Sequence, residues 1–150
     1  MARKKDLQLA SMFALVAVVF AKKVDKGGRP YLIHLAWVMM ALGTDDVELL
    51  CIALGHDLFE DSDVTAAKLR ELGFSERVIE GIRCLTRLEG ETEAEYRAKV
   101  KSNADSIRVK RKDLTHNMDL SRLKKVRPKD LAAVVTYKEF YEELEAFEIA

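Results

Sequence analysis

One short stretch of the chain concentrates most of the side chains that could carry chemistry. Residues 55–61, Gly-His-Asp-Leu-Phe-Glu-Asp, hold one imidazole and three carboxylates directly after a strongly apolar run. On a helix, residues four apart share a face, so His56 would lie beneath Glu60. Asp57 would lie beneath Asp61 in the same way. Carboxylates beside a core-forming segment are costly to bury unless a positive charge lies between them, and a divalent metal ion is the simplest such charge.

Two further residues are candidates for the same metal site. His34 and Asp113 lie at core-facing positions of other predicted helices, and the chain has only three histidines. With His56 and Asp57 they would offer mixed nitrogen and oxygen ligands, which suit Mn²⁺, Fe²⁺ or Zn²⁺. Four protein ligands on a six-coordinate metal leave room for water and a phosphate oxygen. Taken singly, His34 fits a satisfied core histidine equally well, and Asp113 fits a capping or ion-paired acid.

The elements that must position these residues are predicted to be helices. The chain has two prolines and no useful alternating β-branched run, so helices joined by short turns are expected. We therefore predict an all-α fold, a compact helical bundle forming one domain over residues 1–150. The longer helices are expected at about residues 4–24, 31–42, 46–59, 104–120 and 128–148. Shorter ones are expected after the capping residues Thr65, Ser75 and Thr92.

Composition narrows the class of protein. The 150 residues suffice for one domain with a core. Lys+Arg and Asp+Glu are both 25, and this balance argues against nucleic acid as a partner. The apolar segment 9–21 is shorter than the roughly 20 residues of a membrane span, so we expect a buried helix, no membrane partner and a cytoplasmic location. Homo-oligomer formation stays open.

Three segments, in order, resemble a known family. Residues 29–34, RPYLIH, are similar to a PYxxH element, and residues 56–61, HDLFED, match an HDxxED element. Residues 109–117, VKRKDLTHN, are similar to a VKxADxxHN element. These elements belong to the hydrolase domain of the RelA/SpoT family, within the HD superfamily of metal-dependent phosphohydrolases. The resemblance covers about residues 13–123 and is closest to the small stand-alone alarmone hydrolases, such as the metazoan SpoT homologue.

The resemblance implies a metal site and a reaction. It implies that the metal, normally Mn²⁺ in this family although other first-row divalent ions fit, is bound by His34, His56, Asp57 and Asp113. Glu60 and Asp61 correspond to the acidic pair that orients or deprotonates the attacking water. The implied reaction removes the 3′-pyrophosphate from ppGpp or pppGpp, the alarmones of the stringent response, and gives GDP or GTP.

Substrate contacts are expected from five further residues. The family pattern assigns Lys26 and Asn117 to the nucleotide. Lys110 and Arg87 are cations available for phosphate, and Tyr137 could wall the pocket. We assign the remaining histidine, His116, to a structural or exposed position, and Trp37 to the core.

The chain departs from the family pattern where the base should be read. Asp25 stands where the family places an arginine, and Lys112 and Leu114 replace the usual alanine and basic residue of the third element. Hydrolysis of another nucleotide, a nucleoside 5′-monophosphate or NADPH, therefore stays open. A third alternative, from another class, is a protein that sequesters a nucleotide without turnover.

Overall fold

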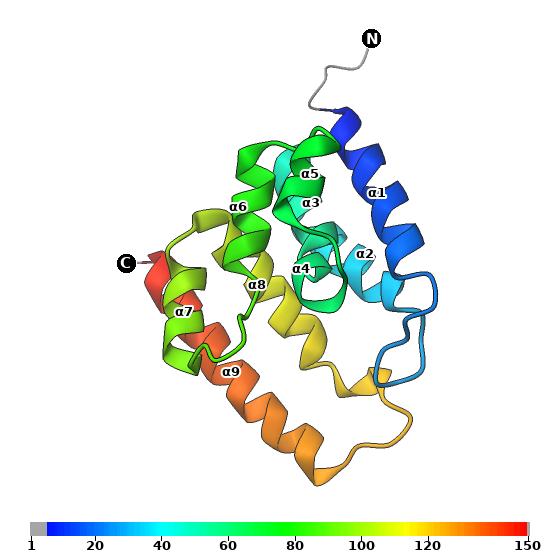
Figure 1. Ribbon diagram of the computed structural model, residues 1–150. Helices are drawn as coiled ribbons and strands as arrows, with labels where there is room; N and C mark the ends of the chain where they lie inside the picture. Colours follow the sequence, from blue (N-terminus) through cyan, green and yellow to red (C-terminus); the bar gives the residue numbers. More distant parts are fainter. Residues whose placement is uncertain (1–5, 150) are drawn as a thin grey trace.

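The chain folds into helices that pack around one another, with no β-strand in the part that the structure describes. This computed structural model describes residues 6–149 (Figure 1). The all-α prediction is confirmed. In order, the elements are α1 Leu7–Val19, α2 Tyr31–Ala41, α3 Val47–Gly55, α4 Leu58–Asp61, α5 Ala66–Glu71, α6 Glu76–Cys84, α7 Glu93–Lys101, α8 Ala104–Asn117, the 3₁₀ helix η1 Leu120–Arg122, and α9 Pro128–Ile149.

Local capping explains where the short helices begin. The side chains of Thr65, Ser75 and Thr92 each accept a hydrogen bond from a backbone N–H three residues later, so these predicted caps are confirmed. Thr92 and Glu95 form a complete capping box. Such caps satisfy backbone donors that the first turn of a helix leaves unpaired, and each contributes about 1 kcal/mol.

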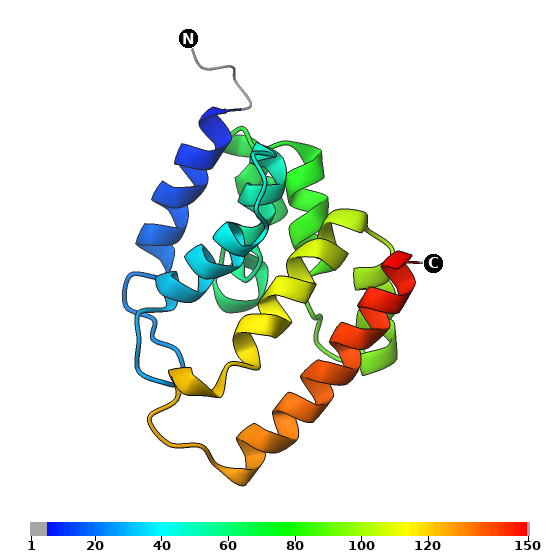
Figure 2. The same cartoon turned by 180° about the vertical axis from the view of Figure 1, so that it is seen from behind.

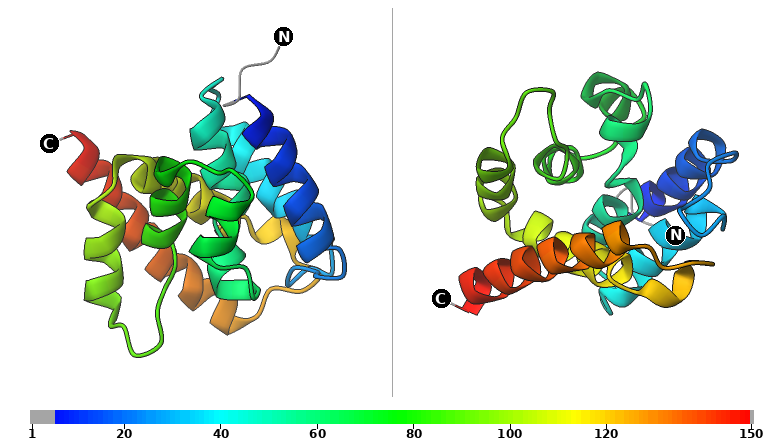
Figure 3. Two further views of the ribbon diagram at one scale, coloured as in Figure 1. Left: turned by 45° about the horizontal axis from the view of Figure 1, so that its top comes forward. Right: turned by 90° about the horizontal axis from the view of Figure 1, so that it is seen from below.

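Helix α3 lies at the centre of the fold. It packs against α1, α2, α6 and α8, and most of its residues are buried. Helix α6 crosses it closely at Gly81, where an added Cβ would lie 2.5 Å from Cδ1 of Ile52. Seen from behind, α9 runs alongside α8 (Figure 2), and a view from below shows it crossing one side of the molecule (Figure 3). The central helix therefore lies between α2 and α8 and contacts both of them.

The first helix ends earlier than predicted. It stops at Val19, and the predicted start at Lys4 lies outside the described residues. Residues 20–30 form a loop instead, closed by an isolated antiparallel bridge between Val24 and Pro30. The backbone N–H of Tyr31 donates to the carbonyl of Lys23 at 2.9 Å. The helix ends because these backbone groups pair across the loop rather than along the axis.

The predicted helix 46–59 is interrupted, and this prediction was wrong. α3 ends at Gly55, and His56 and Asp57 form a turn before the short helix α4. Nδ1 of His56 lies 2.6 Å from the carbonyl oxygen of Ala53 and stabilises this turn. His56 and Asp57 therefore do not lie on one regular helix with Glu60 and Asp61, although the backbone N–H of Asp61 still donates to the carbonyl of Asp57 at 3.0 Å.

None of the helices within residues 6–149 is long and apolar enough to cross a membrane. Both cysteines, Cys51 and Cys84, are buried, and neither forms a disulfide bond.

Candidate metal centre

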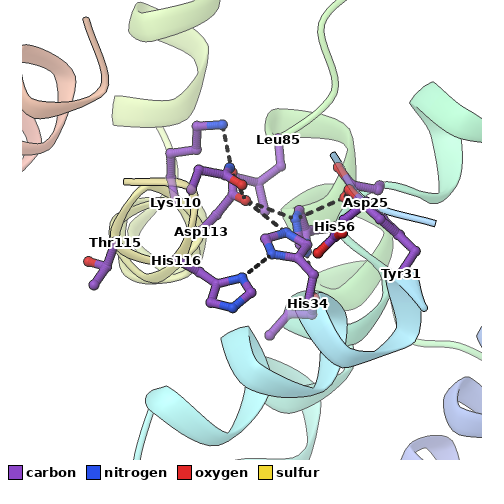
Figure 4. A network of polar contacts seen from close by, with 12 residues as sticks. Asp25, Tyr31, His34, His56, Leu85, Lys110, Asp113, Thr115 and His116 are labelled. Carbon is purple, nitrogen blue, oxygen red and sulfur yellow. Dashed lines mark hydrogen bonds and ion pairs between the residues drawn. The ribbon is translucent and has the colours of Figure 1, made fainter. Parts of the chain in front are cut away.

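Four predicted ligands from three parts of the chain converge at one point. His34 comes from α2, His56 and Asp57 from the turn after α3, and Asp113 from α8. Nε2 of His34 lies 3.1 Å from Oδ1 of Asp113. Nε2 of His56 lies 3.2 Å from Oδ2 of Asp57 and 3.4 Å from Oδ1 of Asp113. Figure 4 shows His34, His56 and Asp113 pointing toward one another.

This arrangement fits a divalent metal ion. Ligand atoms about 2.1 Å from a metal and at right angles to each other lie about 3 Å apart, close to the separations observed. Ligand atoms of His34, His56 and Asp57 all lie within 4.8 Å of one another. Nε2 of His56 is buried and has no hydrogen-bond partner among the described residues. A buried ring nitrogen that faces two carboxylates and lacks a hydrogen bond is what a metal ligand requires.

In both predicted histidine ligands, His34 and His56, Nδ1 contacts another polar group of the protein. Nδ1 of His56 faces the carbonyl of Ala53 at 2.6 Å, and a carbonyl can only accept a hydrogen bond. The proton of neutral His56 therefore lies on Nδ1, and the lone pair of Nε2 points into the cluster. Nδ1 of His34 lies 2.7 Å from Nδ1 of His116, and when His34 donates in this contact its Nε2 also keeps a lone pair for the cluster. Such outer contacts orient metal-binding imidazoles.

His116 is a residue whose place the sequence did not reveal. It is buried, with 4% of its surface exposed, and its ring stacks between His34 and Trp37. Burial, with the charges of His34 and Arg122, lowers the pKa of His116 to about 4, so its ring is neutral and Nδ1 can accept from His34. Trp37 was expected in the core but is 37% exposed, because it covers His116 from outside. The only indication in the sequence was the spacing of three residues between Asp113 and His116, which makes them neighbours on the surface of one helix.

Replacing His116 by leucine is expected to lower metal affinity by about 10–100-fold, the usual cost of losing an outer partner of a ligating histidine. Leucine cannot accept the hydrogen bond that orients His34. The His116→Asn variant is the matched control, because its Oδ1 can take the place of Nδ1 and should restore most of the affinity. Chelator-competition titration with Mn²⁺ measures both variants. Equal affinity for His116→Leu and the wild-type protein would contradict this role.

Polar partners hold the two carboxylates in place. Asp113 accepts from Nζ of Lys110 at 2.8 Å and from Nδ2 of Asn117 at 3.0 Å. Burial raises the pKa of Asp113, but the charge of Lys110 and the contacts with His34 and His56 hold it well below the usual range. The hydroxyl of Tyr31 donates to Asp57.

The two aspartates act on the charge state of His56. Burial alone would lower the pKa of His56, but Asp57 and Asp113 raise it well above the usual range. A positive charge is therefore favoured between these groups, whether it is a proton or a metal ion.

The two predicted catalytic carboxylates lie in different surroundings. Glu60 is exposed at the surface and accepts a hydrogen bond from the backbone N–H of Arg87, and partial desolvation, aided by the charge of Asp57, raises the pKa of its carboxyl group. Asp61 instead forms an ion pair with Lys23 at 2.5 Å, and this ammonium lies 4.1 Å from the ring centre of Tyr31.

A cavity of about 250 Å³ opens beside the cluster and is lined by His34. Three of the predicted substrate contacts line it: Lys26, Asn117 and Tyr137. The other two, Lys110 and Arg87, line a separate cavity of about 150 Å³, which shares only Tyr137 with the first. The structure thus divides the predicted substrate contacts between two cavities.

Lys110 and Arg87 are each engaged by a carboxylate. Lys110 is held against Asp113, and Arg87 forms an ion pair with Glu93. These carboxylates fix the positions of the two cationic groups. Lys26, which lines the first cavity, forms no ion pair within residues 6–149.

Asp25, the departure from the family pattern, ties the loop 20–30 to η1. Its Oδ1 accepts from the backbone N–H groups of Gly27 and Arg29, both at 2.9 Å. Its Oδ2 lies 3.4 Å from Nη1 of Arg122, and both side chains are only 8% exposed. Burial raises the pKa of Asp25, but these hydrogen bonds and Arg122 lower it overall. Both carboxylate oxygens of Asp25 are therefore taken up by contacts within the protein. These contacts hold the loop that forms one wall of the cavity of about 250 Å³.

Comparison with known proteins supports the fold. No protein-family model matches the chain, and no curated protein matches it by sequence. A solved structure matches with a TM-score of 0.75 at 19% identity, over 91% of this chain and 84% of the other. That protein is described as a metazoan ortholog of SpoT that hydrolyzes ppGpp and plays a role in starvation responses. The helical fold expected from the three sequence elements is thus confirmed, since the chain has the same fold as this protein.

Proposed function

We propose that this protein is a metal-dependent nucleotide phosphohydrolase that removes the 3′-pyrophosphate from ppGpp or pppGpp. One observation carries the proposal: two imidazole Nε2 atoms and two aspartates converge beside a cavity of about 250 Å³, and Nε2 of His56 is buried without a hydrogen-bond partner. The fold is that of a protein described as hydrolyzing ppGpp, which supports this substrate.

Each residue of the cluster has a part in the proposed reaction. His34, His56, Asp57 and Asp113 would hold Mn²⁺ or another first-row divalent ion. When bound, such an ion lowers the pKa of a coordinated water and neutralises charge on the phosphate. Lys110 and Asn117 fix the carboxylate of Asp113, and Tyr31 fixes that of Asp57.

Glu60 is proposed as the proton acceptor. Water attacks the phosphorus that is bonded to the ribose O3′, the P–O3′ bond breaks, and O3′ takes up a proton as pyrophosphate leaves. Partial desolvation raises the pKa of Glu60, so its carboxylate holds a transferred proton better than an ordinary glutamate does. Asp61, paired with Lys23, is proposed to orient the water rather than to take its proton.

Turnover assays with purified protein and Mn²⁺ test the proposal. The panel contains ppGpp, pppGpp, NADPH and nucleoside 5′-monophosphates, and we expect pyrophosphate release from the first two. Turnover of monophosphates with ppGpp untouched would contradict the proposed substrate. Metal binding without hydrolysis of any member would instead favour a sequestering protein.

A second candidate substrate class is favoured by Asp25. This side chain stands where the family places a base-contacting arginine, and its oxygens are occupied by Gly27, Arg29 and Arg122. A cavity wall without that arginine suits a nucleotide whose base or sugar differs from that of ppGpp. NADPH and the nucleoside monophosphates in the panel represent this alternative.

A further inference from the structure

The connection between η1 and α9 forms a basic surface next to the candidate metal centre. A second cavity, of about 340 Å³, is lined there by five cations, which we call the basic subsite: Lys26, Lys124, Lys125, Arg127 and Lys129. This cavity shares Lys26, Leu123 and Asp130 with the cavity that reaches His34. Figure 1 shows this connection lying next to the loop between α1 and α2. The basic subsite therefore adjoins the proposed substrate cavity, with which it shares these three residues.

The charges of the basic subsite are not balanced by the protein. Residues 122–129, RLKKVRPK, contain five cations and no carboxylate, in a chain whose formal net charge is zero. Elsewhere, Arg70, Arg77, Arg83 and Arg97 form ion pairs with glutamate or aspartate. Over residues 6–149, by contrast, none of the five side chains of the basic subsite takes part in an ion pair.

The one carboxylate in this cavity is already engaged. Asp130 is buried, and its Oδ2 accepts from the backbone N–H of Arg127 at 2.8 Å, where α9 begins. Like charges that line one cavity repel one another, so an anion placed among them is stabilised. The N-terminus of α9, a helix of 22 residues, adds to the positive potential.

We propose that the basic subsite binds a second anionic group, a phosphate or diphosphate, of the same substrate whose reacting phosphate lies at the metal centre. This inference rests on the proposed function. A substrate that spans both cavities would pass Lys26, Leu123 and Asp130, which line both. The substrate class is a nucleotide with phosphate groups at two separated positions, and a nucleotide with only one such group fills the first cavity alone.

A kinetic comparison tests this subsite. Guanosine 3′,5′-bis(diphosphate) carries the second anionic group, whereas guanosine 3′-diphosphate lacks it. The double variant Lys124→Gln/Lys125→Gln should lower the preference for the first substrate, measured as the ratio of the two kcat/KM values, by about tenfold or more, since each lost hydrogen bond between charged groups is worth about that factor. The loss should appear mainly in KM. An unchanged preference overturns the proposal.

A control with the same change in net charge separates local from general electrostatics. Lys68→Gln/Lys138→Gln removes two exposed lysines on α5 and α9, each of which is paired with a glutamate on its own helix. This control should keep the wild-type preference. If it reduces the preference as much as the loop variant, overall charge is responsible and the basic subsite is rejected.

A binding measurement without turnover keeps this inference separate from the proposed function. Inorganic pyrophosphate is titrated calorimetrically, without added metal, into Asp57→Asn protein, in which the metal site is disabled. Adding Lys124→Gln/Lys125→Gln should weaken binding by about tenfold. Equal affinity with and without the lysine substitutions overturns the subsite. If the wild-type protein hydrolyses neither nucleotide, the proposed function fails, and this titration still decides whether the basic subsite binds phosphate.

Discussion

Asp57→Asn is expected to abolish metal binding and phosphohydrolase activity while the helices stay folded. Asparagine keeps the size of the side chain and an oxygen that can accept from Tyr31, but it removes the negative charge next to Nε2 of His56. A bound metal contributes several kcal/mol to stabilising the charge of a phosphoryl transition state, so turnover should fall by at least about 10³-fold.

Metal content after dialysis against Mn²⁺, steady-state turnover of ppGpp and far-UV circular dichroism measure the three parts of this prediction. Asp63→Asn is the matched control, because Asp63 is exposed and lies only six residues away, beyond α4. It should keep wild-type metal content and turnover. If the Asp57→Asn protein retained its metal, Asp57 could not be a ligand.

The parts of the fold that follow from local interactions could be predicted from the sequence. Thr65, Ser75 and Thr92 cap helices by bonds to residues three positions away, and such bonds depend only on nearby side chains. The ligand set is spread over the chain, yet it was predicted because the order of three short elements resembles one family. Ligand atoms of His34, His56 and Asp57 lie within 4.8 Å of one another, which agrees with that prediction. That these residues bind a metal is our proposal.

The parts that were missed depend on contacts between distant segments. The loop 20–30 is held by Arg122, which is 97 residues from Asp25 in sequence. An added Cβ on Gly27 would lie 2.1 Å from the carbonyl oxygen of Arg122, so only glycine fits this contact. Apolar periodicity up to Val24 therefore predicted a longer helix than the one that forms. A tertiary contact outweighed local helix propensity.

Side-chain direction was the second limit on prediction. Lys110 and Arg87 were expected at the substrate because of their charge, yet their carboxylate partners hold them around a different cavity. His116 was placed by its helix face alone, and only the approach of α2 to α8 makes it the partner of His34. A sequence reports residue types and spacing, whereas these roles depend on which helices meet.

Glu60→Gln is expected to lower turnover by about 10²–10⁴-fold, the usual contribution of a general base, while metal binding is retained. Glutamine is nearly the same size and can still accept from the backbone N–H of Arg87, so the α4 turn should keep its place. It cannot take up the proton of the attacking water. Steady-state turnover of ppGpp and metal content, measured on the same preparation, separate these two effects.

Two comparisons make the Glu60 prediction specific. Glu89→Gln, an exposed position in the loop before α7, makes the same chemical change away from the cluster and should leave turnover unaltered. Asp61→Asn should cost less than Glu60→Gln, because the carboxylate of Asp61 is held in an ion pair with Lys23. Loss of metal from Glu60→Gln would make Glu60 a ligand. A larger loss of turnover in Asp61→Asn would assign proton transfer to Asp61, and Lys23 would then have to release it during the reaction.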